Sequence, residues 1–124
     1  FMLFNMMGLF RFAMRIASPT ICRDPRFPIM MDRDLSSTTL ESFLISIATL
    51  RKTDLRPKLH EVRVPVMGIY GQQDNIVNPK QYCILQKEIP SSRIELFEKS
   101  AHFVMLDEHQ RFLAVLKDFL DAPN

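Results

Sequence analysis

The residues that could do chemistry are an acid and a histidine that each follow an apolar segment. Asp74 comes just past the apolar run 64–70, which ends at Gly71, and His102 comes just past a second segment whose apolar residues are Ile94, Leu96 and Phe97. In a parallel sheet, catalytic groups gather at the carboxyl ends of the strands. A histidine, with an unperturbed pKa of about 6.5, can accept and return a proton near neutral pH, and a carboxylate can orient it. The spacing therefore indicates a candidate acid–histidine pair.

Each of these residues also has a simpler structural interpretation. Asp74 could cap a turn with Asn75, and His102 could be an ordinary loop histidine. The other two histidines offer no competing site, because His60 sits in a charged connector and His109 at a helix start, where we expect solvated side chains. The residues alone leave the catalytic and the structural interpretations of the pair open.

Metal-binding and nucleotide-binding motifs do not occur in the sequence. His102, Asp107 and His109 straddle a loop and a helix start without the H-E-x-x-H spacing of a zinc site, and neither G-x-G-x-x-G nor G-K-S/T is present. Cys22 and Cys83 lie 61 positions apart (83 minus 22) with no C-x-x-C partner, which favours reduced, buried thiols over a disulfide framework. We therefore expect no metal and no cofactor.

Composition and charge predict a globular chain without a nucleic-acid partner. The 124 residues are 47% hydrophobic, and 16 basic against 14 acidic residues give a net charge of +2 with no long basic block. The apolar residues 1–17 are interrupted by Asn5, Gly8, Arg11 and Arg15, whereas a membrane span needs roughly 18 or more consecutive apolar residues. We therefore expect no membrane span and, with no targeting segment in sight, a cytoplasmic location.

Two helices are predicted before the first strand. Residues 1–17 have a broad apolar face, and residues 38–52 repeat apolar residues at the helical interval behind a capping-box pattern of Thr38 and Glu41. Between them, residues 18–34 hold three prolines among charges and predict a loop.

The second half of the chain has the pattern of alternating strands and helices. The nearly continuous apolar run 64–70 predicts a strand that is buried on both faces. A helix follows, with Asn78 as its N-cap and Pro90 after its end, and then a second strand at 94–97 and a final helix from Asp107. This order predicts two parallel strands joined by a crossover helix, in an α/β fold.

These segments resemble the C-terminal part of an α/β-hydrolase, with the last helices of its lid followed by its final two strands and helices. The specific matches are the P-V-x-G-x-Y-G-x-x-D segment that ends at Asp74 and the A-H-F segment that holds His102. A further match is the D-E pair at 107–108, which is followed by Phe112 and Phe119-Leu120. The resemblance covers nearly the whole chain and is strongest over its second half.

The resemblance implies both a domain organisation and a role for the pair. Residues 1–61 would be lid helices and a connector, and residues 62–124 the strand–helix–strand–helix end of the core. Asp74 and His102 would be the acid and the histidine of a nucleophile–His–acid triad. The family often has glycine just before the histidine, where this chain has Ala101, so a left-handed backbone at that position would be strained.

The nucleophile of such a triad is missing from these residues. The elbow G-x-S-x-G places a Ser, Cys or Asp two positions before a glycine, but this chain has Met6, Val66 and Ile69 there. We therefore predict that the 124-residue chain is inactive by itself. Its expected partners are the missing N-terminal part of the same fold and a small apolar or ester-type substrate, with the substrate-binding residues unknown. The alternative is a hydrolase-like binding or interaction protein without chemistry.

Overall fold

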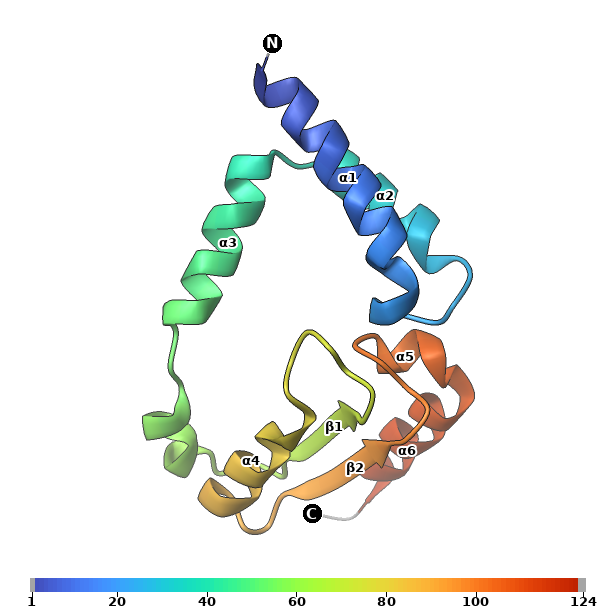
Figure 1. Cartoon of the computed structure of the whole chain (residues 1–124). Coiled ribbons are helices and arrows are strands. Elements are labelled where there is room, and N and C mark those ends of the chain that lie inside the picture. The colour runs from blue at the N-terminus through green and yellow to red at the C-terminus, as the bar shows by residue number, and fades with distance from the viewer. Residues whose placement is uncertain (1, 123–124) are drawn as a thin grey trace. The chain divides into compact units, whose positions relative to one another are not determined.

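A computed structural model describes residues 2–122, with side chains from residue 6 onward (Figure 1). In chain order, the elements are α1 Met2–Ile21, α2 Phe27–Ser36, α3 Leu40–Lys52, the 3₁₀ helix η1 Arg56–Glu61, β1 Met67–Gly71, the 3₁₀ helix η2 Pro79–Gln81, α4 Tyr82–Glu88, β2 Arg93–Phe97, α5 Val104–Asp107 and α6 His109–Asp121. These elements form two compact units. Unit 1 comprises the residues up to Pro19 with Asp24–Asp54, and unit 2 comprises Thr20–Arg23 with the residues from Leu55 on.

Helix α1 continues four residues past its predicted end and includes Pro19 in its last turn. Proline has no N–H, so it cannot donate to the carbonyl of Arg15 four positions earlier, as a residue inside a helix normally does. The hydroxyl of Ser18 donates to this carbonyl instead, at 2.7 Å. This hydrogen bond satisfies the carbonyl that the proline would leave unpaired.

Helix α2 lies where the sequence predicted a loop, so that prediction was wrong. Its proline, Pro28, stands in the first turn, where a missing N–H leaves no hydrogen bond unmade. The carbonyl of Asp24 accepts the N–H of Phe27 at 3.0 Å and closes the turn that leads into the helix. Phe27, Met31 and Leu35 are buried and recur every four positions, which is the helical interval. The prolines obscured this pattern in the sequence.

Helix α3 was predicted with its N-cap displaced by one residue. Thr39, with an extended backbone, caps the helix through a side chain that accepts the N–H of Ser42 at 3.1 Å. The predicted capping box of Thr38 and Glu41 is therefore wrong. The existence of the helix and its end at Lys52 are confirmed.

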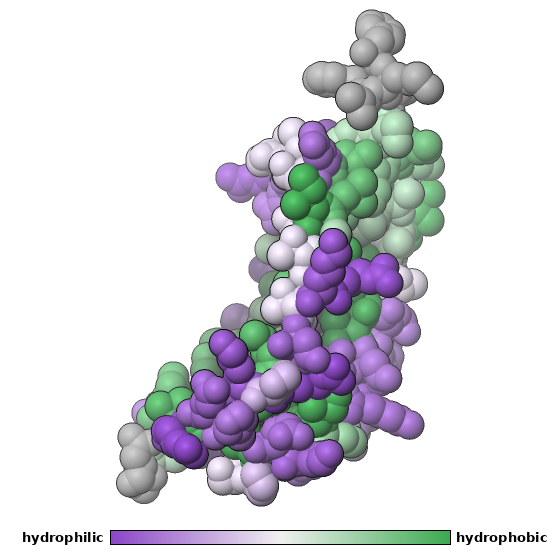
Figure 2. Space-filling view, turned by 90° about the vertical axis from the view of Figure 1, so that its left-hand side faces the viewer, coloured by the Kyte–Doolittle hydropathy of each residue, from purple (hydrophilic) through white to green (hydrophobic). Residues whose placement is uncertain are grey.

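Unit 1 is held together by contacts from α1 to both of the other helices. Arg11 pairs with both carboxylate oxygens of Asp32 on α2, at 2.8 and 2.7 Å, and the rings of Phe10 and Phe43 on α3 lie 5.1 Å apart. No residue of α3 is buried, and its exposed large apolar side chains are Leu44, Ile45, Ile47 and Leu50. Figure 2 views the protein from the α3 side and shows hydrophobic residues, in green, at the surface. None of the described helices is both long enough and apolar enough to cross a membrane.

The two strands of unit 2 are parallel, as the sequence predicted (Figure 1). Met67 stands opposite Arg93 at one end, and Gly71 stands opposite Phe97 at the other. The prediction that the first strand is buried on both faces was wrong, because only Gly68 and Gly71 of its five residues are buried. Within the described residues, β1 pairs with β2 alone, so its other edge has no strand beside it.

The helices of unit 2 support the strand pair from two directions. Asn78 caps the helical segment that becomes α4, as predicted, and its side chain accepts the N–H of Lys80 at 3.0 Å. Helix α4 then contacts both strands. On α6, the guanidinium of Arg111 lies 4.0 Å from the centre of the Phe97 ring and donates to the carbonyl of Leu96 at 3.0 Å. The final helix predicted from residue 107 is confirmed as α6, which begins at His109, whereas the short helix α5 before it was not predicted.

Candidate active site

The ends of the two strands bring Asp74 and His102 into direct contact. The Nδ1 atom of His102 lies 2.8 Å from the Oδ2 atom of Asp74. The carboxylate is the more enclosed partner, with 12% of the Asp74 side chain exposed against 33% of the His102 side chain. Among the described residues, none forms a hydrogen bond with Nε2 of His102, so the ring can present this nitrogen to another group.

The carboxylate of Asp74 is held in its ionised form by a set of hydrogen bonds. Its Oδ1 atom accepts the N–H groups of Ile76 at 2.7 Å and Val77 at 2.9 Å, while Oδ2 faces His102. Burial by itself would raise the pKa of Asp74, but the hydrogen bonds from Val77, His102 and Ile76 outweigh burial and lower the pKa. Asp74 thus caps a turn and contacts the histidine at the same time. Its interpretation as a turn cap is therefore compatible with its interpretation as the partner of a catalytic histidine.

The loop after β1 and the loop after β2 are in close backbone contact. The N–H of Gln73 donates to the carbonyl of Ser100 at 3.0 Å, and its side-chain amide donates to the carbonyl of Glu98 at 2.8 Å. A Cβ atom on Gly71 would lie 2.1 Å from the carbonyl oxygen of Ala101 and 2.6 Å from that of Ser100. Only glycine therefore permits this approach, which places Asp74 beside the histidine loop.

The backbone of the histidine loop is fixed by Ile21 and Asp107, to which the sequence assigned no role at the site. The N–H of His102 donates to the carbonyl of Ile21 at 2.9 Å, and the N–H of Ala101 donates to Oδ2 of Asp107 at 2.7 Å. The ring of Phe103 meets the imidazole edge-on at 5.2 Å. No described non-glycine residue has a positive φ, so the strain considered for Ala101 does not arise.

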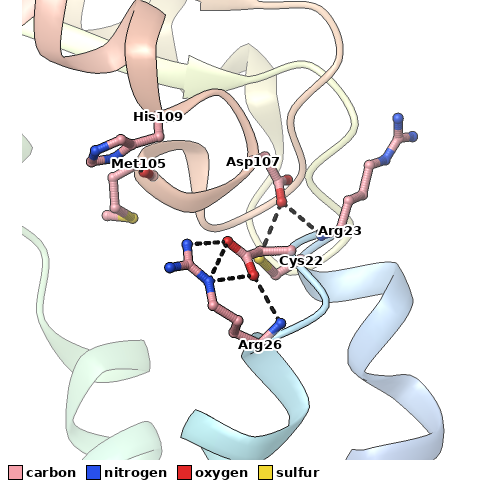
Figure 3. A network of polar contacts seen from close by, with 7 residues as sticks. Cys22, Arg23, Arg26, Met105, Asp107 and His109 are labelled. Carbon is pink, nitrogen blue, oxygen red and sulfur yellow. Dashed lines mark hydrogen bonds and ion pairs between the residues drawn. The ribbon is translucent and has the colours of Figure 1, made fainter.

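The remaining histidines and the cysteines do not contact Asp74 or His102 through their side chains. His60 and His109 are exposed, and Nδ1 of His109 lies 3.1 Å from the carbonyl of Met105 (Figure 3). Cys22 is buried as predicted, but Cys83 is exposed on α4, a short helix that has no buried residue. Within residues 2–122, no group of three His, Cys, Asp or Glu side chains is arranged to hold a metal ion.

Comparisons with known proteins agree with this architecture. No protein-family model matches the chain. The chain is 34% identical over 76 residues to a proline iminopeptidase from Saccharolobus solfataricus, covering 60% of this chain and 24% of that protein. It is 32% identical over 79 residues to a pimeloyl-[acyl-carrier protein] methyl ester esterase from Vibrio parahaemolyticus, covering 64% of this chain and 31% of that protein.

A solved structure matches over almost the whole chain. An esterase from Exiguobacterium antarcticum superposes with a TM-score of 0.74 at 23% identity, covering 97% of this chain and 46% of that chain. The chain thus spans from about a quarter to about a half of the length of these proteins. In sequence and in fold, it corresponds to the C-terminal part of an α/β-hydrolase.

Proposed function

We propose that Asp74 and His102 are the acid and the histidine of a catalytic triad in a hydrolase that cleaves an ester or a similar bond. One observation carries the proposal: His102 Nδ1 lies 2.8 Å from Asp74 Oδ2 at the carboxyl ends of two parallel strands. The similarity to an esterase and a peptidase supports the reaction class. In this proposal, residues 1–61 are lid helices with a connector, and residues 62–124 are the end of the catalytic core.

The geometry assigns each residue a step. Ionised Asp74 accepts the Nδ1 proton of His102, which leaves the lone pair on Nε2. Nε2 can then take the proton of an attacking nucleophile and return it to the leaving group, while Asp74 stabilises the imidazolium that forms in between.

The nucleophile and the oxyanion donors must come from residues outside this sequence, which has no nucleophile elbow. The chain by itself is therefore inactive in this proposal. It needs the N-terminal part of the same fold as its partner. The substrate is a small apolar or ester-type molecule.

The test is a chimera in which this chain replaces the region that it matches in the Exiguobacterium antarcticum esterase. Hydrolysis of a short-chain p-nitrophenyl ester is measured for the chimera and for the 124-residue chain alone, and we expect turnover only in the chimera. In the chimera, His102→Ala should lower kcat by about 10⁶-fold. Asp74→Asn should lower kcat by about 10⁴-fold, because the histidine would lose its correct tautomer.

The exposed histidines provide matched controls. His60→Ala and His109→Ala remove the same kind of side chain from solvated positions and should leave hydrolysis unchanged. Unchanged hydrolysis in His102→Ala would contradict the proposal. A chimera that folds by circular dichroism and binds an ester without hydrolysing it would favour the alternative, a hydrolase-like binding protein.

A further inference from the structure

We propose that Asp107 is a positioning residue for His102. Its carboxylate ties the loop that carries the histidine to the residues that follow helix α1. This inference rests on the proposed catalytic role of His102 and adds to it the group that holds the histidine backbone in place.

The carboxylate of Asp107 collects three donors from two distant parts of the chain. Its Oδ2 atom accepts the N–H of Ala101, the residue immediately before His102, at 2.7 Å. Its Oδ1 atom accepts the N–H of Arg23 at 2.6 Å and the thiol of Cys22 at 3.1 Å (Figure 3). Only 3% of Ala101 and 2% of Cys22 are exposed, so water does not compete for these two donors.

A further hydrogen bond joins the same two segments in the opposite direction. The N–H of His102 donates to the carbonyl of Ile21 at 2.9 Å. Residues 21–23 therefore hold the N–H groups of two successive loop residues, one directly and one through Asp107. Because both N–H groups are fixed, the backbone of His102 is held in place by contacts other than the one between its side chain and Asp74.

The number and kind of donors require a carboxylate at position 107. An ionised Asp has two acceptor oxygens and no donor, and hydrogen bonds to a charged acceptor are the stronger ones. An amide would offer one oxygen and would turn an NH₂ group toward N–H donors. Asp107→Asn therefore keeps the size of the side chain but loses part of the hydrogen bonding that holds the histidine loop. A displacement of about 1 Å in a catalytic group can cost roughly 10²-fold in rate.

The test is the ¹⁵N NMR signature of the His102 ring in the 124-residue chain, which reports the tautomer without any turnover. In the wild-type chain, we expect a single tautomer with the proton on Nδ1 and a slowly exchanging Nδ1–H signal. In Asp107→Asn, the Nδ1–H signal should broaden or vanish while the far-UV circular dichroism stays unchanged. Asp118→Asn is the matched control, because that carboxylate is 67% exposed and pairs with Arg93. Its spectrum should match that of the wild-type chain.

A folded Asp107→Asn variant with the wild-type His102 signature would overturn the proposal. If this variant does not fold, two variants at Cys22 take its place. Cys22→Ser keeps a donor to Asp107 and should preserve the signature, whereas Cys22→Ala removes the donor and should broaden it. Identical His102 spectra in these two variants would also overturn the proposal.

Hydrolysis separates this inference from the proposed function. In an active chimera, Asp107→Asn should lower kcat by about 10²-fold with little change in KM. A chimera without hydrolysis would count against the triad and leave the NMR result standing. An unchanged NMR signature in Asp107→Asn would count against positioning by Asp107 and leave the triad standing.

Discussion

Substitution of Gly71 tests the geometry of the site most directly. Gly71 ends β1 at the point where the acid loop passes the histidine loop. In Gly71→Ala, the new Cβ would lie 2.1 Å from the carbonyl oxygen of Ala101 and 2.6 Å from that of Ser100. Both oxygens belong to the backbone and cannot rotate away as a side chain can. The two loops must therefore move apart.

The cost of this movement can be worked out from the contacts between the loops. Forcing extra carbon into a packed site costs about 1–3 kcal/mol. The hydrogen bond from the N–H of Gln73 to the carbonyl of Ser100, 3.0 Å long, bridges the same loops, and its loss adds about 1 kcal/mol. We therefore expect Gly71→Ala to lower the free energy of unfolding by about 2–4 kcal/mol. As the loops move apart, the distance between Asp74 Oδ2 and His102 Nδ1 should also increase.

The assay is urea unfolding followed by far-UV circular dichroism, with the other two glycines as controls. Gly8→Ala places its Cβ in open space on helix α1 and should raise the free energy of unfolding by up to about 1 kcal/mol. In Gly68→Ala, the Cβ meets the side chains of Tyr70 at 2.7 Å and Leu85 at 2.8 Å, which can move, so the loss should be smaller than in Gly71→Ala. If Gly71→Ala costs no more than Gly68→Ala, the two loops are not in the close contact described.

Two further predictions concern the acid and a helix cap. Because the pKa of Asp74 is lowered in the folded chain, its carboxylate stabilises the fold fully above the ordinary value of 3.8, and this contribution is lost as the pH falls through the lower folded value. Asp74→Asn should therefore flatten the pH dependence of urea midpoints measured between about pH 2 and pH 5, and an unchanged profile would argue against the lowered pKa. Thr39→Ala should lower the free energy of unfolding by about 1 kcal/mol, because the N–H of Ser42 loses its cap. Thr38→Ala should have a smaller effect, and equal losses in the two variants would argue against Thr39 as the cap.

The positions of Asp74 and His102 could be predicted because they follow from local patterns. Each residue comes a few positions after the end of a strand. The order strand, helix, strand makes the strands parallel, which brings their carboxyl ends to one edge of the sheet. The burial of β1 could not be predicted in the same way. An apolar run shows that a strand can be buried, whereas burial itself depends on neighbours that the run does not specify.

The errors in the helices also have physical causes. Proline breaks a helix interior but favours a first turn, so Pro28 is ambiguous until the buried interval from Phe27 to Leu35 is counted. Thr38 and Thr39 are both good capping residues. The choice between them depends on the extended backbone of Thr39, with φ −98° and ψ 153°, which aims its side chain at the helix start. The residue types alone therefore show neither that Pro28 begins a helix nor that Thr39 is the cap.

The support for His102 joins residues that sequence spacing cannot connect. Cys22 and Asp107 are 85 positions apart, and no periodic pattern relates them. The first residues of Thr20–Arg23 end helix α1, but this segment belongs to unit 2. Its hydrogen bonds reach the histidine loop and Asp107. The geometry of the acid–histidine pair is therefore a property of residues 20–23 together with 71–108. A change in the residues that follow α1 should disturb His102 even though they contribute no group to the proposed chemistry.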